Sequence, residues 1–190
     1  MMAFLCLVMF AFLLTAWGSN GAKAQNSYQN LILSTDHDQH YLSPYLLRYP
    51  ENNEITNAYD ILTKKSLKRE LINDKGSILL FKINDETTWF SFDVVNRSKQ
   101  EKWILQTGDQ YQGKFGLFNS ITVYSFDRET SKLKEIPFNN GNNINIELSQ
   151  NNKTRVILKF EKPKGAPITT PLYLTKSTYI TETNNLDLRK

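Results

Sequence analysis

The feature that most constrains the fold is a series of short apolar segments whose side chains alternate between two faces. Residues 88–95 read TWFSFDVV, so Phe90 and Phe92 fall on one face and Trp89 falls on the other. A period of two is typical of a β-strand, because successive side chains of a strand point to opposite sides. We therefore expect Phe92 to be buried in the core of a sheet protein.

Further segments of this kind follow at short and regular spacing. The pattern predicts additional strands at residues 77–83, 103–108, 120–127, 133–136, 144–148, 154–160 and 171–180. The stretch FNNGNN at residues 138–143 carries an Asn-Gly turn signal. The sequence has no long helical patterns between these segments, which excludes a parallel α/β sheet. We expect an all-β fold, an antiparallel β-sandwich.

One segment has helical rather than alternating spacing. Apolar residues recur at roughly helical intervals within residues 55–71, and Thr56 or Asn57 can cap the start. Pro44 and Pro50, just upstream, disfavour a longer helix. We expect one short amphipathic helix beside the strands.

The composition is that of one globular domain. The chain has 190 residues, of which 40% are hydrophobic and 22% are charged, and its formal net charge is +4. Its densest basic cluster falls in the expected helix, where it is typical of a solvated face. Nucleic-acid binding would need a basic stripe with interleaved aromatic residues. We expect no nucleic-acid partner.

The N-terminal residues predict export. Residues 2–17 carry no charge, and Ala22-Lys23-Ala24 forms an A-x-A cleavage pattern. We interpret residues 1–24 as a signal peptide; an uncleaved membrane anchor is the alternative. Cys6 is the single cysteine and would leave with the signal, so no disulfide is expected. This suits a bacterial periplasmic or secreted protein with no stable membrane span after cleavage.

The remaining chain divides into three parts. Residues 25–38 are expected to be an exposed lead-in, residues 39–180 the folded sandwich, and residues 181–190 a polar tail.

A metal site is conceivable in the stretch DHDQH. It would use the side chains of Asp36, His37, Asp38 and His40. Four ligands on a flexible segment lack a scaffold and supporting hydrogen bonds, so we favour a solvated segment. We expect no metal and no cofactor.

Signatures of catalysis are absent from the sequence. It contains no G-x-S-x-G, P-loop, dinucleotide-binding or HExxH motif. A hydrolase remains a minor alternative, based on the carboxylates of Asp85-Glu86 and Asp109. These residues also suit ordinary turn positions, and we expect a protein that is not an enzyme.

Aromatic side chains are the candidate ligand contacts. Tyr111 and Phe115 lie in the glycine-bearing loop DQYQGKFGLFN, where an exposed ring could stack on a sugar. Trp89 and Trp103 begin neighbouring strands and are the other candidates. We expect both indoles mainly to hold the sandwich together, and the loop to contact the ligand.

The order of these motifs resembles a known family. The stretch TTWFSFDVVNRSKQEKWILQTGD, followed by SITVYSFD, is similar to the second type of extracellular sensor domain of bacterial 7TM-DISM receptors. The residues that carry the resemblance are Trp89, Phe92, Asn96, Trp103-Ile104-Leu105 and Val123-Tyr124. HYLSPYLLRYPENNEIT, SILLFKINDETTW and PLYLTKS resemble other segments of the family, so the similarity covers roughly residues 39–180.

The resemblance implies a jelly-roll-like β-sandwich similar to carbohydrate-binding modules. It further implies a sensor of a small ligand such as a carbohydrate, with no catalytic residues. Family receptors continue into seven membrane helices, whereas this chain ends ten residues after its last predicted strand. We expect a stand-alone exported version or a truncated receptor. The partner is then a small molecule or a membrane receptor; the alternative is a structural or partner-docking domain of the envelope.

Overall fold

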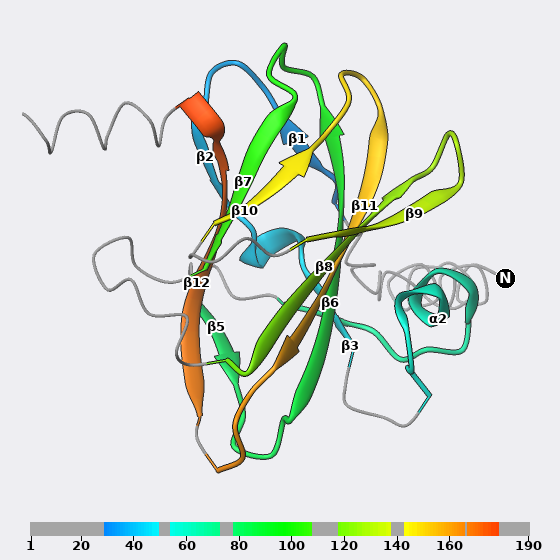
Figure 1. Ribbon diagram of the computed structural model, residues 1–190, viewed down its shortest axis with the longest axis vertical. Helices are drawn as coiled ribbons and strands as arrows, with labels where there is room; N and C mark the ends of the chain where they lie inside the picture. Colours follow the sequence, from blue (N-terminus) through cyan, green and yellow to red (C-terminus); the bar gives the residue numbers. More distant parts are fainter. Residues whose placement is uncertain are drawn as a thin grey trace, which may run out of the picture.

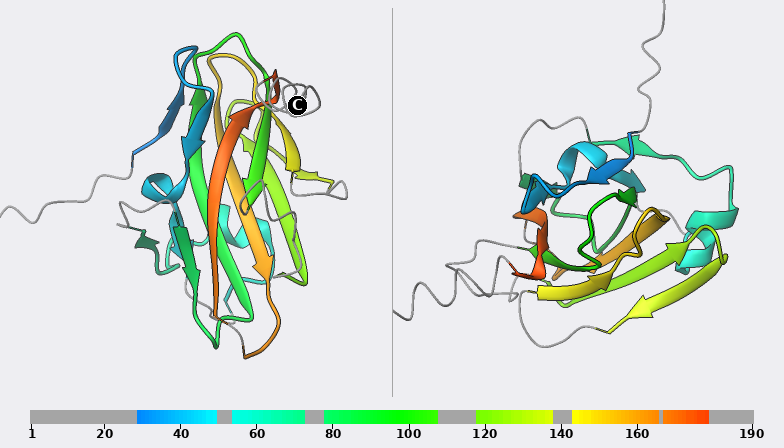
Figure 2. Two further views of the ribbon diagram at one scale, coloured as in Figure 1. Left: turned by 90° about the vertical axis from the view of Figure 1, so that its left-hand side faces the viewer. Right: turned by 90° about the horizontal axis from the view of Figure 1, so that it is seen from above.

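Two β-sheets packed face to face make up the protein, as a computed structural model shows (Figures 1 and 2). The structure describes residues 29–49, 54–72, 78–107, 118–137, 143–165 and 167–178. Within them the strands form one seven-stranded and one five-stranded sheet. The chain is therefore an all-β sandwich.

The larger sheet has the strand order β4-β3-β6-β11-β8-β9, with β1 beside β6. Its strands are β1 (Leu31–Leu33), β3 (Leu47–Tyr49), β4 (Glu70–Leu71), β6 (Thr87–Asn96), β8 (Ser120–Asp127), β9 (Lys132–Ile136) and β11 (Lys153–Glu161). The pairing is antiparallel except between β1 and β6.

The smaller sheet is antiparallel, with the order β10-β7-β12-β2 and with β5 also paired to β12. Its strands are β2 (Gln39–Tyr41), β5 (Ile78–Phe81), β7 (Lys102–Thr107), β10 (Asn143–Glu147) and β12 (Ile168–Lys176). All eight strands that the alternating pattern predicts are present, with shifted ends.

The core lies between the two sheets. Phe90, Phe92 and Val94 of β6 point into it, and Phe92 is fully buried, which confirms the predicted face. Trp103 and Leu105 of β7 reach in from the smaller sheet. Apolar residues from both sheets thus form one continuous cluster, as expected for a sandwich.

A second, smaller cluster covers the outer face of the larger sheet. Helix α2 (Ala58–Thr63) packs there through Ile61 and, as Figure 1 shows, lies outside the sandwich. Asn57 caps it: its side chain accepts bonds from the backbone N–H groups of Tyr59 and Asp60.

The helix is shorter than residues 55–71, the expected range. Lys64 is already extended, with ψ 105°. Beyond it Leu67 is buried in the second cluster, and the chain continues into β4, which pairs with β3. Sheet pairing and burial therefore override the helical spacing of residues 64–71.

The expected exposed lead-in is wrong in one part. Leu31 and Leu33 are 1% and 0% exposed, because β1 pairs with β6 and inserts both side chains into the main core. Part of residues 25–38 therefore belongs to the fold. The predicted signal peptide (1–24), most of the Asn-Gly turn and the polar tail (181–190) lie outside the described residues. In the described part, no helix is long and apolar enough to cross a membrane.

Candidate functional site

Of the predicted ligand contacts, Tyr111 and Phe115 lie outside the described residues. Trp103 is 0% exposed, and its indole Nε1 donates a hydrogen bond of 3.0 Å to the carbonyl oxygen of Gln100. This ring anchors the end of β7 inside the core. Its predicted structural role is confirmed.

Trp89 is buried on the other side of the larger sheet, in the cluster under helix α2. Its ring stacks on Tyr124 with centroids 6.4 Å apart, and Lys159 Nζ lies 5.7 Å from the ring centroid. Trp103 therefore packs in the core between the two sheets, whereas Trp89 packs on the outer face of the larger sheet. Neither ring is open to a ligand in this conformation.

The polar turn between the tryptophans is held by Asn96, which is 1% exposed. Its Nδ2 donates to the carbonyl oxygens of Gln100 and Leu148, at 2.8 and 2.7 Å. Its Oδ1 accepts bonds from the backbone N–H and hydroxyl of Ser98. Asn96 thus fixes the turn that seats Trp103, so this motif residue serves the fold.

The histidines do not join a cluster of metal ligands: among the described residues no group of three or more His, Cys, Asp or Glu could hold an ion. His37 and His40 pack edge to face, and His40 also lies against Trp103. Burial, with smaller contributions from the charges of His37 and Lys176, lowers the pKa of His40 below its usual 6.5. His40 is therefore mainly a core-facing side chain.

Two of the three carboxylates considered for a hydrolase form ion pairs. Asp85 pairs with Arg48 and accepts a bond from the backbone N–H of Lys82. Glu86 lies 3.0 Å from Lys164 Nζ in an exposed ion pair. Asp109 lies outside the described residues.

The outer face of the smaller sheet carries a group of side chains suited to binding. Because Leu172 and Leu174 point into the core, Tyr173 and Thr175 point outward. The register places Tyr173 opposite both Tyr41 on β2 and Gln106 on β7. We call this surface the tyrosine–amide face; it consists of Gln39, Tyr41, Gln106, Asn143, Tyr173 and Thr175.

The two tyrosines of this face lie side by side. Their ring centroids are 4.8 Å apart and their planes are inclined by 52°. Tyr41 is 49% exposed and Tyr173 is half-buried. In Figure 2 (left) this sheet faces the viewer with β12 in front, and no described helix lies over it. The pair therefore offers aromatic surface to solvent.

Polar side chains form a hydrogen-bonded ladder beside the tyrosines. Gln39 Nε2 donates to Thr175 Oγ1 at 3.4 Å, and Thr175 Oγ1 donates to Gln106 Oε1 at 2.8 Å. Gln106 Nε2 donates to Asn143 Oδ1 at 3.2 Å. The ladder crosses β2, β12, β7 and β10, about 14 Å at ordinary strand spacing. Gln106 and Thr175 are 4% and 0% exposed, so the amides open to solvent are those of Gln39 and Asn143, which keep further donor or acceptor capacity.

The same side of β5 and β12 is apolar further along. Ile78 and Leu80 are 51% and 56% exposed and lie opposite Pro171 and Thr169. Along β12, the outer face of the smaller sheet therefore presents amides first, then tyrosines, and then exposed aliphatic side chains.

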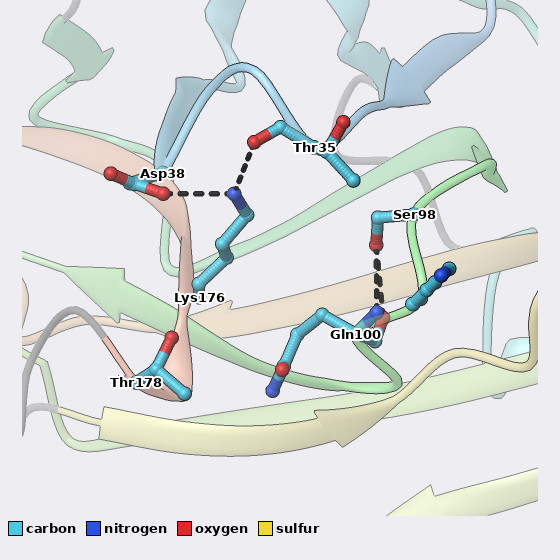
Figure 3. A pocket seen from close by; sticks show the side chains of 7 residues that line it. Thr35, Asp38, Ser98, Gln100, Lys176 and Thr178 are labelled. Carbon is cyan, nitrogen blue, oxygen red and sulfur yellow. Dashed lines mark hydrogen bonds and ion pairs between the residues drawn. The ribbon is translucent and has the colours of Figure 1, made fainter.

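A polar pocket of ≈ 360 Å³ opens at the end of the sandwich near β2 and β12 (Figure 3). Its central cation, Lys176, donates from Nζ to the carbonyl oxygen of Thr35 and to Asp38 Oδ1, both at 2.8 Å. Ser98 and Gln100 line the opposite side and bond within their own turn. These bonds tie the ends of the strands together, so the pocket is a weaker candidate than the tyrosine–amide face.

Comparison with known proteins finds no match to a family model, a curated protein or a solved structure. The site therefore stands on its geometry. The sequence held a signal for it: Tyr173 and Thr175 alternate with Leu172 and Leu174. What the sequence lacked was the register that brings Tyr41 to Tyr173.

Proposed function

We propose that the protein is an exported ligand-binding module that holds a neutral, polyhydroxylated ligand, a carbohydrate, on the tyrosine–amide face. The observation that carries the proposal is the Tyr41–Tyr173 pair, of which Tyr41 is exposed and Tyr173 half-buried, beside a ladder of amides. Aromatic rings stack on the C–H faces of sugars, while amides exchange hydrogen bonds with hydroxyl groups. None of the six side chains of the face is charged, which favours a neutral ligand.

The module is a sensor without catalysis in this proposal. The resemblance to the extracellular domains of 7TM-DISM receptors supports a jelly-roll-like binding module that works outside the cytoplasmic membrane. The predicted signal peptide supports a periplasmic or secreted location, and a membrane receptor is a fitting partner. The loop with Tyr111 and Phe115 begins directly after β7, the strand that carries Gln106. We expect this loop to add contacts at the edge of the face.

Calorimetric titration with a panel of neutral oligosaccharides tests the proposal. The double variant Tyr41→Ala, Tyr173→Ala should bind at least about tenfold more weakly, because each ring contributes roughly 0.5–1.5 kcal/mol of stacking energy. Tyr59→Ala is the matched control, since Tyr59 is 58% exposed on helix α2, at the other sheet. A double variant that is folded and binds like the wild type would rule out the face as the site.

A second variant pair separates the face from the loop. Tyr111→Ala, Phe115→Ala should weaken binding less than loss of the two sheet tyrosines. Full loss of binding in the loop variant, with normal binding in the sheet variant, would move the site to the loop.

Docking of a protein partner is the second candidate function, favoured by the exposed Ile78 and Leu80. A contiguous apolar surface beside polar residues is typical of interaction sites. Ile78→Ser, Leu80→Ser should leave oligosaccharide binding intact. If these changes abolish co-purification with a membrane receptor, the partner docks on the exposed aliphatic side chains of Ile78 and Leu80.

A further inference from the structure

A pocket of ≈ 290 Å³ lies between helix α2 and the outer face of the larger sheet. Tyr59, Leu62 and Thr63 of the helix form one wall, and Phe126 of β8 lies on the sheet side. Arg128 and Arg155 complete the lining. We call it the helix pocket. Its lining is mostly apolar and includes these two guanidinium groups.

The two arginines belong to a cluster of cations around Asp93. Asp93 of β6 is 1% exposed and accepts two bonds from Arg155, at 2.7 and 3.0 Å. It accepts another from Arg128 Nη2 at 2.6 Å, and Lys153 Nζ lies 3.5 Å away. Three cations thus surround one carboxylate.

Two of these cations remain accessible. The side chains of Arg128 and Lys153 are 39% and 38% exposed, and within the described residues neither forms another ion pair. A guanidinium has five N–H donors, and the bond to Asp93 uses one of those of Arg128. Nearby acids are engaged elsewhere: Asp60 of α2 pairs with Lys64, and Asp127 accepts backbone bonds of its own turn.

We propose that the helix pocket binds an amphipathic monoanion, a carboxylate on a short apolar chain. The carboxylate would be held by Arg128, with Lys153 adding positive charge from beside Asp93, while the chain would lie on Tyr59, Leu62 and Phe126. The accessible guanidinium of Arg128 selects an anion over a neutral molecule, and the apolar walls select against a fully hydrated anion such as inorganic phosphate. This site is separate from the tyrosine–amide face, which lies on the other sheet.

Calorimetric titration with sodium octanoate, compared with 1-octanol and inorganic phosphate, tests the proposal on the full chain. Octanoate should bind at least about tenfold more tightly than either, and its affinity should fall with added salt because the pairing groups are partly exposed. Equal affinity for octanoate and octanol, or no measurable binding of octanoate, would overturn the proposal.

Variants locate the site. Arg128→Gln should weaken octanoate binding about tenfold without affecting octanol, since Asp93 keeps Arg155 and Lys153 as partners and the fold is retained. Tyr59→Ser should weaken both ligands through lost apolar contact. Tyr41→Ala is the matched control on the other sheet and should change neither. Wild-type affinity for octanoate in folded Arg128→Gln and Tyr59→Ser variants would place the anion elsewhere and reject the helix pocket.

Discussion

The two sheets of the sandwich share one core but differ in what covers their outer faces. On the larger sheet, Trp89 and Ile157 are buried beneath helix α2. On the smaller sheet, Tyr41 and Leu80 are about half exposed in the described structure. One outer face is thus a second core, whereas the other is partly open to solvent, at Tyr41 and Leu80, and partly buried, at Gln106 and Thr175.

This difference shows why the same alternating pattern has different consequences. On β6 the outward residues include Trp89, Ser91 and Asp93, and all three are buried because the helix and neighbouring basic residues cover them. On β12 the outward Tyr173 is half-buried and Thr175 is buried within the hydrogen-bonded ladder, although no described helix lies above them. Alternation therefore fixes which side a residue faces, but the covering elements decide whether that side can bind a ligand.

The shared core should give the largest effect. Phe92→Ala removes a fully buried ring between the sheets, and we expect a loss of roughly 3–5 kcal/mol in the free energy of unfolding. Typical domains have only 5–15 kcal/mol in total. Urea titration followed by tryptophan fluorescence measures the change. A melting temperature within a few degrees of the wild type would mean that β6 does not hold the two sheets together.

The covered face should give the next largest effect. Ile61→Ala empties the site where α2 packs on the larger sheet, and we expect a loss of about 2–3 kcal/mol, the lower part of the usual range because a six-residue helix can shift. Tyr59→Ala, an exposed position on the same helix, should change stability by less than about 0.5 kcal/mol. Equal effects of the two changes would show that the helix does not form a second core.

Asp93 tests the polar edge of the covered face. Burial by itself raises the pKa of Asp93, but hydrogen bonds and positive charge from Arg155 and Arg128 outweigh it and hold the pKa below its usual 3.8. The stability from this carboxylate is therefore complete above the usual pKa and is lost as pH falls through the lowered one.

Asp93→Asn should accordingly lower stability by about 1–3 kcal/mol at neutral pH, because charge-assisted bonds are lost and three cations face one another. The difference between the variant and the wild type should shrink as pH falls below 3.8 and should vanish once it is below the lowered pKa of Asp93. Chemical unfolding at a series of pH values measures both effects. A constant difference down to strong acid would mean that packing, and not the ion cluster, makes Asp93 important.

Much of this fold could be predicted from the sequence, because the long strands contain enough alternation to show a period of two. The strands the sequence did not reveal, such as Leu31–Leu33 and Glu70–Leu71, have two or three residues, too few to show a period. Their position depends on distant partners: β1 is held by β6, more than fifty residues away along the chain. The same reason explains why the helix is shorter than expected: residues 70–71 form β4 because they pair with β3, a contact that local spacing does not reveal.

The candidate site was harder to predict for a related reason. Trp89 and Trp103 were conspicuous in the sequence, yet large aromatic residues on long strands are the ones most easily buried. Tyr41 and Tyr173 are inconspicuous, and their proximity follows only from the pairing of β2 with β12. Residue type could therefore suggest an aromatic binding surface, but not which aromatic residues form it.

The open face should give the smallest effect on stability. Tyr41→Ser removes a ring that is 49% exposed and lies against Tyr173 with the planes inclined by 52°, so we expect a loss of at most about 1 kcal/mol in the free energy of unfolding. Tyr41→Phe keeps the ring and should be near neutral. Thermal unfolding of both variants, next to Ile61→Ala, provides the direct comparison of the two outer faces. If Tyr41→Ser destabilises as much as Ile61→Ala, the tyrosine pair is a structural cluster like the one under α2. A small loss in the free energy of unfolding would instead show that the Tyr41 ring contributes little to folding. Its exposed surface would then be free to contact a ligand.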